Sequence, residues 1–171
     1  MYLYHGTSVE AAEQIKLHGF STGVSNNWKV KSKPGFVYLS LAYAPFFAEA
    51  AKSKSHNRVL IKVSIPESKL YPDDDFIMFY LNKPVYTNKD LAKINLEDYK
   101  FLTKQSLDHL GNASAKPQDI KIIGFREFNS SKLWQVCDPS ITPLNYRFMG
   151  GYYKGLSNWI YSGKTPESYI E

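Results

Sequence analysis

Strict alternation of apolar and polar positions marks the strands of this chain. In the segment 59–65 every second residue is Val or Ile, and this period of two predicts a strand with one buried face. Residues 2–5 alternate in the same way, with Leu3 and His5 on one face, and predict a short strand. The apolar run 36–39 predicts a buried strand. Two later runs are also predicted strands, at residues 120–125 and 133–136.

Helical spacing follows the first two predicted strands. Residues 9–18 predict a helix, with a capping box in the run Thr7-Ser8-Val9-Glu10 and Gly19 as a favourable end. A second helix is predicted to begin between Ser40 and Pro45. Shorter helical patches lie at residues 89–92 and 103–110. Since no repeat, low-complexity segment or linker divides the chain, we expect one α+β domain over residues 1–171.

Composition narrows the class of protein. Hydrophobic residues make up 43% and aromatic residues 15% of the chain, which excludes a disordered protein. No apolar run approaches the length of a membrane-spanning helix, and the first residues lack the pattern of a signal peptide. The single cysteine excludes an intramolecular disulfide. We therefore expect a cytoplasmic domain without a membrane partner.

Common catalytic motifs are absent. The chain has no P-loop, no dinucleotide-binding glycine fingerprint, no zinc-protease histidine pair and no nucleophile elbow. The four histidines lie far apart without the spacing of metal ligands, so no metal site is expected.

The run His5-Gly6-Thr7 combines three chemical capacities at the end of the first predicted strand. Glycine lets a ligand approach the backbone, and imidazole donates and accepts near neutral pH. The helix start that follows supplies N–H groups for an anion. The structural alternative is a buried histidine beside a glycine that only turns the chain.

A second run extends this pattern. Gly35-Phe36-Val37-Tyr38-Leu39-Ser40 precedes an alanine-rich helix, and the strand at 59–65 follows. In this order and spacing, residues 2–66 resemble the ADP-ribosyltransferase superfamily, in particular its diphtheria-toxin and poly(ADP-ribose)-polymerase branch. The resemblance fades beyond residue 66. It implies a split pair of small twisted β-sheets flanked by helices, with an NAD cleft between them.

The resemblance also implies roles for individual residues, with NAD as the substrate and no metal. His5 would hydrogen-bond the adenosine ribose, Gly6 would meet the nicotinamide amide through its backbone, and Tyr38 would stack on the nicotinamide ring. Breaking the nicotinamide–ribose bond passes through an oxocarbenium-like state that needs an oriented ribose and nearby negative charge. For Tyr38, a purely structural role in the core stays open. The implied NAD-binding residues are His5, Gly6, Thr7, Tyr38, Ser40 and Phe47.

The third catalytic position departs from the family. There the family often carries a glutamate on a late strand, and this chain has none at that place. We take Gln105 and Asp75 as the candidates beside His5 and Tyr38, although acidic runs such as 73–75 are usually solvated turns. Neighbouring polar residues are Asp108 and Asn112, with Glu127 further on. The missing glutamate favours a mono-ADP-ribosyltransferase over a chain-building enzyme.

The distribution of positive charge suggests which class of molecule accepts the ADP-ribose. The net charge is +5, and residues 141–164 interleave cations with aromatic rings and contain no carboxylate. Such patterns suit single-stranded nucleic acid, through phosphate contacts and base stacking. The alternative is a set of solvated lysines and a tail packed on the core. The candidate nucleic-acid contacts are Lys29, Lys31, Lys33, Arg58, Arg147 and Lys154.

The sequence thus predicts a mono-ADP-ribosyltransferase that modifies RNA or single-stranded DNA, in the manner of a toxin or phage-linked effector with an inhibitor or antitoxin protein as partner. We also expect His5 and Tyr38 on neighbouring strands with both side chains in one pocket. One alternative is an enzyme like the tRNA 2′-phosphotransferases, which usually carry a second histidine at the place of Tyr38. The other is a catalytically inactive nucleotide- or nucleic-acid-binding module of the same fold.

Overall fold

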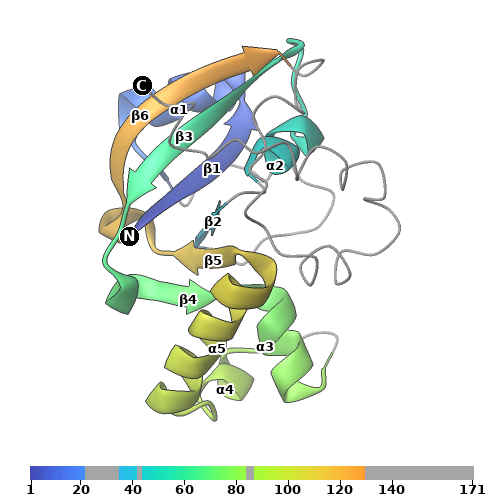
Figure 1. Cartoon of the computed structure of the whole chain (residues 1–171), viewed down its shortest axis with the longest axis vertical. Helices are drawn as coiled ribbons and strands as arrows, with labels where there is room; N and C mark the ends of the chain where they lie inside the picture. Colours follow the sequence, from blue (N-terminus) through green and yellow to red (C-terminus); the bar gives the residue numbers. More distant parts are fainter. Residues whose placement is uncertain (22–34, 42–43, 84–86, 130–171) are drawn as a thin grey trace.

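The computed structural model describes residues 1–21, 35–41, 44–83 and 87–129. Their fold is α+β, as predicted, and is built on one antiparallel sheet in the order β4-β5-β2-β1-β3-β6 (Figure 1). The strands are β1 (Tyr2–Ser8), β2 (Val37–Ser40), β3 (Asn57–Ser64), β4 (Leu70–Pro72), β5 (Asn112–Ala115) and β6 (Lys121–Asn129). The six strands therefore form a single sheet where a pair of sheets was expected.

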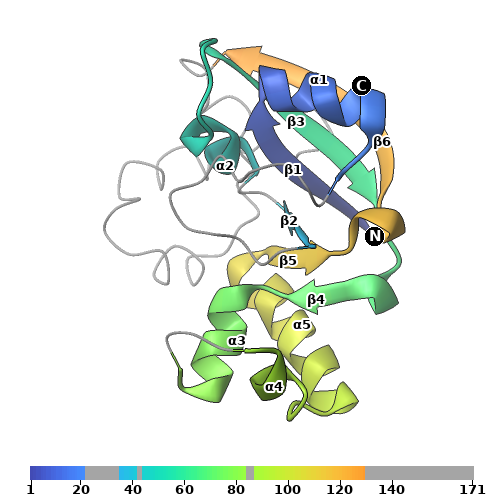
Figure 2. The same cartoon turned by 180° about the vertical axis from the view of Figure 1, so that it is seen from behind.

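Helices pack on both faces of this sheet. They are α1 (Val9–His18), α2 (Ala44–Ala50), α3 (Asp74–Leu81), α4 (Asn88–Leu91) and α5 (Leu96–Leu110), with 3-10 turns at Glu67–Lys69 and Pro117–Asp119. In Figure 2, α1 lies in front of β1 and β3, whereas Figure 1 shows it behind them. Helices α3, α4 and α5 gather at the β4 end of the sheet.

Alternation along the strands separates two cores. Leu3 and Ile61 point to the α1 face and are fully buried there. Tyr4 and Leu60 point to the other face and pack on α2 with Ala44. Burying one large aliphatic side chain stabilises the fold by about 1.5–3 kcal/mol. The predicted alternation of the first strand and of segment 59–65 is therefore confirmed, but segment 59–65 is buried on both faces where one was expected.

Helix α1 has the predicted bounds but a different cap. The hydroxyl of Ser8 accepts from the main-chain N–H of Ala11 at 3.2 Å. The cap is Ser8 and not the predicted Thr7, because the helix begins at Val9, one residue later than a Thr7 cap requires. Gly19 ends the helix with a φ of +70°, as its position predicts.

Other elements depart from the sequence predictions. The acidic run after Pro72 opens helix α3, where a turn was expected, and acidic side chains are favourable at a helix start. Helix α5 begins earlier than predicted, at an Asn95 cap that accepts from the N–H of Asp98. The short strands β4 and β5 were not predicted. The predicted strand 133–136 and the aromatic segment 141–164 lie outside the described residues.

Candidate functional site

Strands β1 and β2 pair at a single position, Tyr4 opposite Ser40. Strand β1 meanwhile pairs with β3 along its whole length. Continuing the antiparallel register would set Gly6 opposite Tyr38, but the described strands are not paired there. The ladder therefore opens at one place, which we call the seam and define as His5, Gly6, Tyr38 and Leu39.

His5 bridges the seam with its side chain. Its Nδ1 lies 2.9 Å from the main-chain oxygen of Tyr38. Since a carbonyl only accepts hydrogen bonds, Nδ1 carries the hydrogen. Burial lowers the pKa of His5 below its ordinary value of 6.5, against the opposing effect of this hydrogen bond, so the ring is neutral at pH 7. The lone pair then resides on Nε2, to which no other group of the described residues hydrogen-bonds.

The side chains of His5 and Tyr38 leave the sheet on opposite faces. Tyr38 lies two residues before Ser40, which shares a face with Tyr4, and His5 directly follows Tyr4. Packing agrees, because the His5 ring meets the edge of Phe20 on the α1 face, at 5.2 Å between centroids. The prediction that both side chains line one pocket is therefore wrong. The prediction of neighbouring strands is confirmed.

The hydroxyl of Tyr38 donates a short hydrogen bond to Oδ2 of Asp74. Asp74 is the first residue of α3, so this bond ties β2 to a helix across the β4 end of the sheet. Tyr71 of β4 contacts Tyr99 of α5 edge to face nearby, at 6.3 Å between centroids. Burial, with neighbouring Tyr71 and Asp74, raises the pKa of Tyr99. The carboxylate beside Tyr38 is thus held within an aromatic cluster.

Gly6 is required by packing. A Cβ built at this residue would lie 1.7 Å from the main-chain oxygen of Ala44, so only glycine lets α2 approach β1 so closely. This gives the residue a structural reason that needs no ligand. Thr7 and Ser40 are buried in their strands, and Phe47 is partly buried on α2.

Asn112 places a buried amide beside the seam. It opens β5, pairs with Ser40 and therefore shares the face of Tyr38. Its side chain is 8% exposed, and Oδ1 has no hydrogen-bond partner among the described residues. A buried oxygen without a donor is costly, and such a group in a native protein calls for an explanation, such as a catalytic role or a bound water or ion. The sequence analysis named Asn112 only as a polar neighbour of the expected glutamate position; its place directly after Gly111, which ends α5, is the local signal that could have singled it out.

The remaining candidates for the third catalytic position have other surroundings. Gln105 is partly buried on α5, one residue before the fully buried Ser106. Asp75 belongs to α3, but its side chain lies outside the described part of the structure. Its neighbour Asp74, which the sequence analysis did not single out, is the residue of the acidic run that accepts from the Tyr38 hydroxyl. Glu127 is exposed on β6 and accepts from Asn57, away from the seam.

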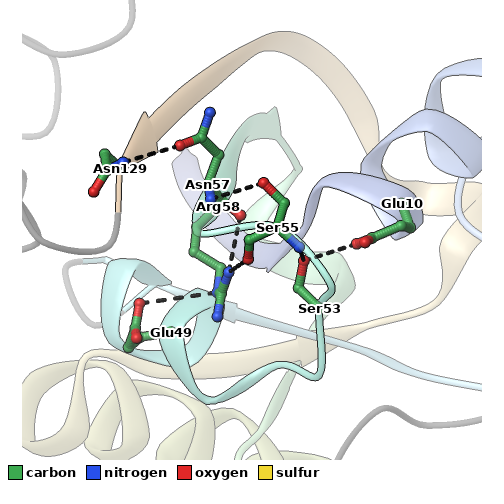
Figure 3. A network of polar contacts seen from close by, with 7 residues as sticks. All are labelled: Glu10, Glu49, Ser53, Ser55, Asn57, Arg58 and Asn129. Carbon is green, nitrogen blue, oxygen red and sulfur yellow. Dashed lines mark hydrogen bonds and ion pairs between the residues drawn. The ribbon is translucent and has the colours of Figure 1, made fainter.

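Arg58 is not available to nucleic acid. Its guanidinium is buried, donates to the main-chain oxygens of Ser55 and Asn57, and lies 3.9 Å from a carboxylate oxygen of Glu49 (Figure 3). The same network continues to Glu10, which accepts from the Ser53 hydroxyl. Its role is to anchor the connection between α2 and β3, which corrects the sequence prediction. The other predicted nucleic-acid contacts lie outside the described residues: Lys29, Lys31, Lys33, Arg147 and Lys154.

A cleft of about 430 Å³ opens on the α1 face. Neither His5 nor Tyr38 lines it, but Phe20 does, and Phe20 also contacts His5. Its other lining residues are Gly19, Ser21, Pro117, Gln118, Ile120 and Ile122. The cleft therefore lies one side chain away from the seam.

Within the described ranges, no three His, Cys, Asp or Glu side chains are grouped so that they could hold a metal ion. None of the described helices has the length and apolar composition needed to cross a bilayer. Comparisons of this chain with known protein families, with curated proteins and with solved structures give no match.

Proposed function

We propose that this protein is a mono-ADP-ribosyltransferase that transfers ADP-ribose from NAD to RNA or single-stranded DNA. The observation that carries the proposal is the hydrogen bond from His5 to the main chain of Tyr38 at the seam. Through it, the two motifs that resemble this superfamily meet although 33 residues separate them.

In this proposal Tyr38, His5 and Asn112 have separate tasks. The nicotinamide ring stacks on Tyr38, whose hydroxyl Asp74 holds in place. Nδ1 of His5 fixes the main chain of Tyr38 from the opposite face of the sheet, so His5 positions Tyr38 and does not itself contact the nucleotide. Positive charge develops on the ribose as nicotinamide leaves, and the unpartnered Oδ1 of Asn112 supplies the partial negative charge that stabilises it.

A second candidate is a nucleotide-binding module of the same fold that does not catalyse transfer. The packing of Gly6 against Ala44 favours it, since this glycine is explained without any ligand. An amide at Asn112 also lacks the full charge of a carboxylate, which weakens stabilisation of a cationic transition state.

Labelled NAD separates the two candidates. The full chain is incubated with NAD labelled in its ADP-ribose part and with separate pools of RNA, single-stranded DNA and protein. We expect release of nicotinamide and label on nucleic acid. NAD binding without nicotinamide release would support the module, and absence of NAD binding would contradict both. Label on protein alone would assign a protein acceptor.

Variants at the seam test the assignment of residues. His5→Ala and Tyr38→Ala should each lower NAD turnover about 30- to 1,000-fold, equal to about 2–4 kcal/mol of transition-state stabilisation. His56→Ala is the matched control, because His56 is exposed in the connection before β3. Undiminished turnover in both seam variants would show that their roles are structural.

The acceptor has its own test. If Lys29, Lys31 and Lys33 contact the nucleic acid, labelling should weaken with salt, with a slope of about −0.7 per phosphate neutralised. Replacing the three lysines with glutamate should abolish labelling of nucleic acid and leave nicotinamide release intact. Loss of both activities would place these residues at the donor site.

A further inference from the structure

One buried hydroxyl connects the two elements that flank Tyr38 on the β4 side. Ser106 of α5 is fully buried. Its Oγ accepts from the main-chain N–H of Asp73 at 3.0 Å and donates to the main-chain oxygen of Asn112 at 2.6 Å. A hydroxyl can serve both partners at once, because it has one hydrogen and two lone pairs.

The first partner sets the direction of α3. The carbonyl of Asp73 accepts from the N–H of Ile77 at 3.3 Å, so the helix starts from this residue. Holding the N–H of Asp73 therefore orients the first helical turn. That turn carries Asp74, whose carboxylate receives the Tyr38 hydroxyl.

The second partner sets the start of β5. Asn112 pairs with Ser40 of β2, and the neighbouring carbonyl of Gly111 accepts from the N–H of Leu41 at 2.7 Å. The hydroxyl of Ser106 thus holds the strand that presents the unpartnered Oδ1 of Asn112.

We propose that Ser106 is a positioning residue that sets Asp74 against Tyr38 and Asn112 beside β2. The test of Ser106 by NAD turnover rests on the proposed function, whereas the effect of Ser106 on the environment of Tyr38 can be measured without NAD. Replacement by alanine leaves two buried main-chain groups without a partner and lets the start of α3 move.

A double-mutant cycle measures this coupling. Ser106→Ala and Asp74→Asn should each lower NAD turnover about tenfold, mainly in kcat, as expected for a displaced site group. The double variant should be no slower than Asp74→Asn alone, because both changes disturb the same contact. Effects that multiply in full would show that Ser106 does not act through Asp74 and would overturn the proposal.

A spectroscopic readout works without activity. In protein labelled with ¹³C at tyrosine Cζ, the Tyr38 resonance is assigned by its loss in Tyr38→Phe. Ser106→Ala should shift this resonance, and Ser106→Thr, which keeps the hydroxyl, should restore it. Thr103→Val is the matched control, since Thr103 is also buried on α5 but bonds Tyr99 within its own helix.

The two readouts fail separately. If the wild-type protein does not turn over NAD, the proposed function is wrong, and the Tyr38 resonance still tests the role of Ser106. If folded Ser106→Ala leaves that resonance unmoved, or Thr103→Val shifts it equally, the positioning role is wrong. If Ser106→Thr does not fold, the comparison of Ser106→Ala with Thr103→Val decides.

Discussion

Two tyrosine–aspartate pairs in this protein have the same chemistry and different surroundings. The Tyr38–Asp74 pair is partly buried and joins a central strand to α3. The Tyr80–Asp98 pair is exposed and joins α3 to α5, at 2.9 Å. In water the exposed pair exchanges one set of hydrogen bonds for another, whereas a partly buried carboxylate that loses its donor also loses solvation. The burial of such a tyrosine–aspartate pair therefore decides how much it contributes to the stability of the fold.

The same contrast extends to two regions. We call the exposed contacts Tyr80–Asp98 and Glu10–Ser53 the rim, and compare them with the seam. At the seam, the backbone has to shift when a substitution adds a methyl group or removes a hydroxyl. At the rim, water replaces what a substitution removes.

The largest effect should follow from Gly6→Ala at the seam. The new Cβ would meet the backbone of Ala44, which cannot rotate away, so α2 must move off the sheet. We expect the free energy of unfolding to fall by about 3 kcal/mol, the upper part of the range for overpacking. Urea unfolding followed by circular dichroism measures this change.

Gly111→Ala provides the comparison. Gly111 has a φ of +65°, and its added Cβ would be 3.7 Å from the nearest atom, an ordinary contact. Only the backbone conformation is penalised there, at about 1–2 kcal/mol. Equal losses for Gly6→Ala and Gly111→Ala would contradict the close packing of α2 on β1.

The second effect should come from Tyr38→Phe. It removes the donor to Asp74 and keeps the ring, so the free energy of unfolding should fall by about 1.5–3 kcal/mol, the net contribution of a hydrogen bond to a charged group. Tyr80→Phe removes the same chemical bond at the rim and should leave the unfolding midpoint unchanged. Similar midpoints for both variants would remove the distinction between seam and rim.

The spacing of apolar residues along the chain predicted those helices and strands that such local spacing determines. Strand β3 and helix α1 follow from alternation and from helical spacing bounded by Ser8 and Gly19. Strand β4 has three residues and ends in Pro72, and β5 alternates polar residues with alanines whose side chains are too small to mark a strand. These strands exist because β5 pairs with both β2 and β4, a contact between distant segments.

The candidate site shows the same limit. Alternation placed Leu3 and His5 on one face correctly, but the face of Tyr38 depends on the register between β1 and β2, which no local pattern encodes. The choice of Asp74 over Asp75 likewise depends on the start of α3, which Ser106 fixes from 33 residues away. The sequence could name the residue types of the site and not their mutual orientation.

The smallest effects on the free energy of unfolding should be those of pH. The contribution of the seam and that of the rim should be lost at different pH values. At the seam, the pKa of His5 is lowered in the folded protein. The unfolded chain therefore binds protons more readily than the folded chain below pH 6.5. The stability linked to His5 is present above pH 6.5 and is lost as pH falls through the lowered folded value. His5→Gln, whose amide can still donate to Tyr38, should not show this loss.

At the rim, hydrogen bonds from its own N–H, from the N–H of Lys54 and from the Ser53 hydroxyl lower the pKa of Glu10 to about 2. Its ordinary pKa is 4.5, so its contribution to stability should persist above pH 4.5 and disappear as pH falls towards 2.

Both pH effects are measured by urea unfolding. The unfolding midpoints of the wild type, His5→Gln and Glu10→Gln are compared from pH 8 to pH 2.5. The gap between wild type and His5→Gln should change first on acidification, and the gap between wild type and Glu10→Gln only below pH 4.5. Because Glu10 is exposed, salt should shrink its gap and leave that of His5 in place. The reverse order, or equal sensitivity to salt, would show that the His5 ring at the seam is solvated like the rim.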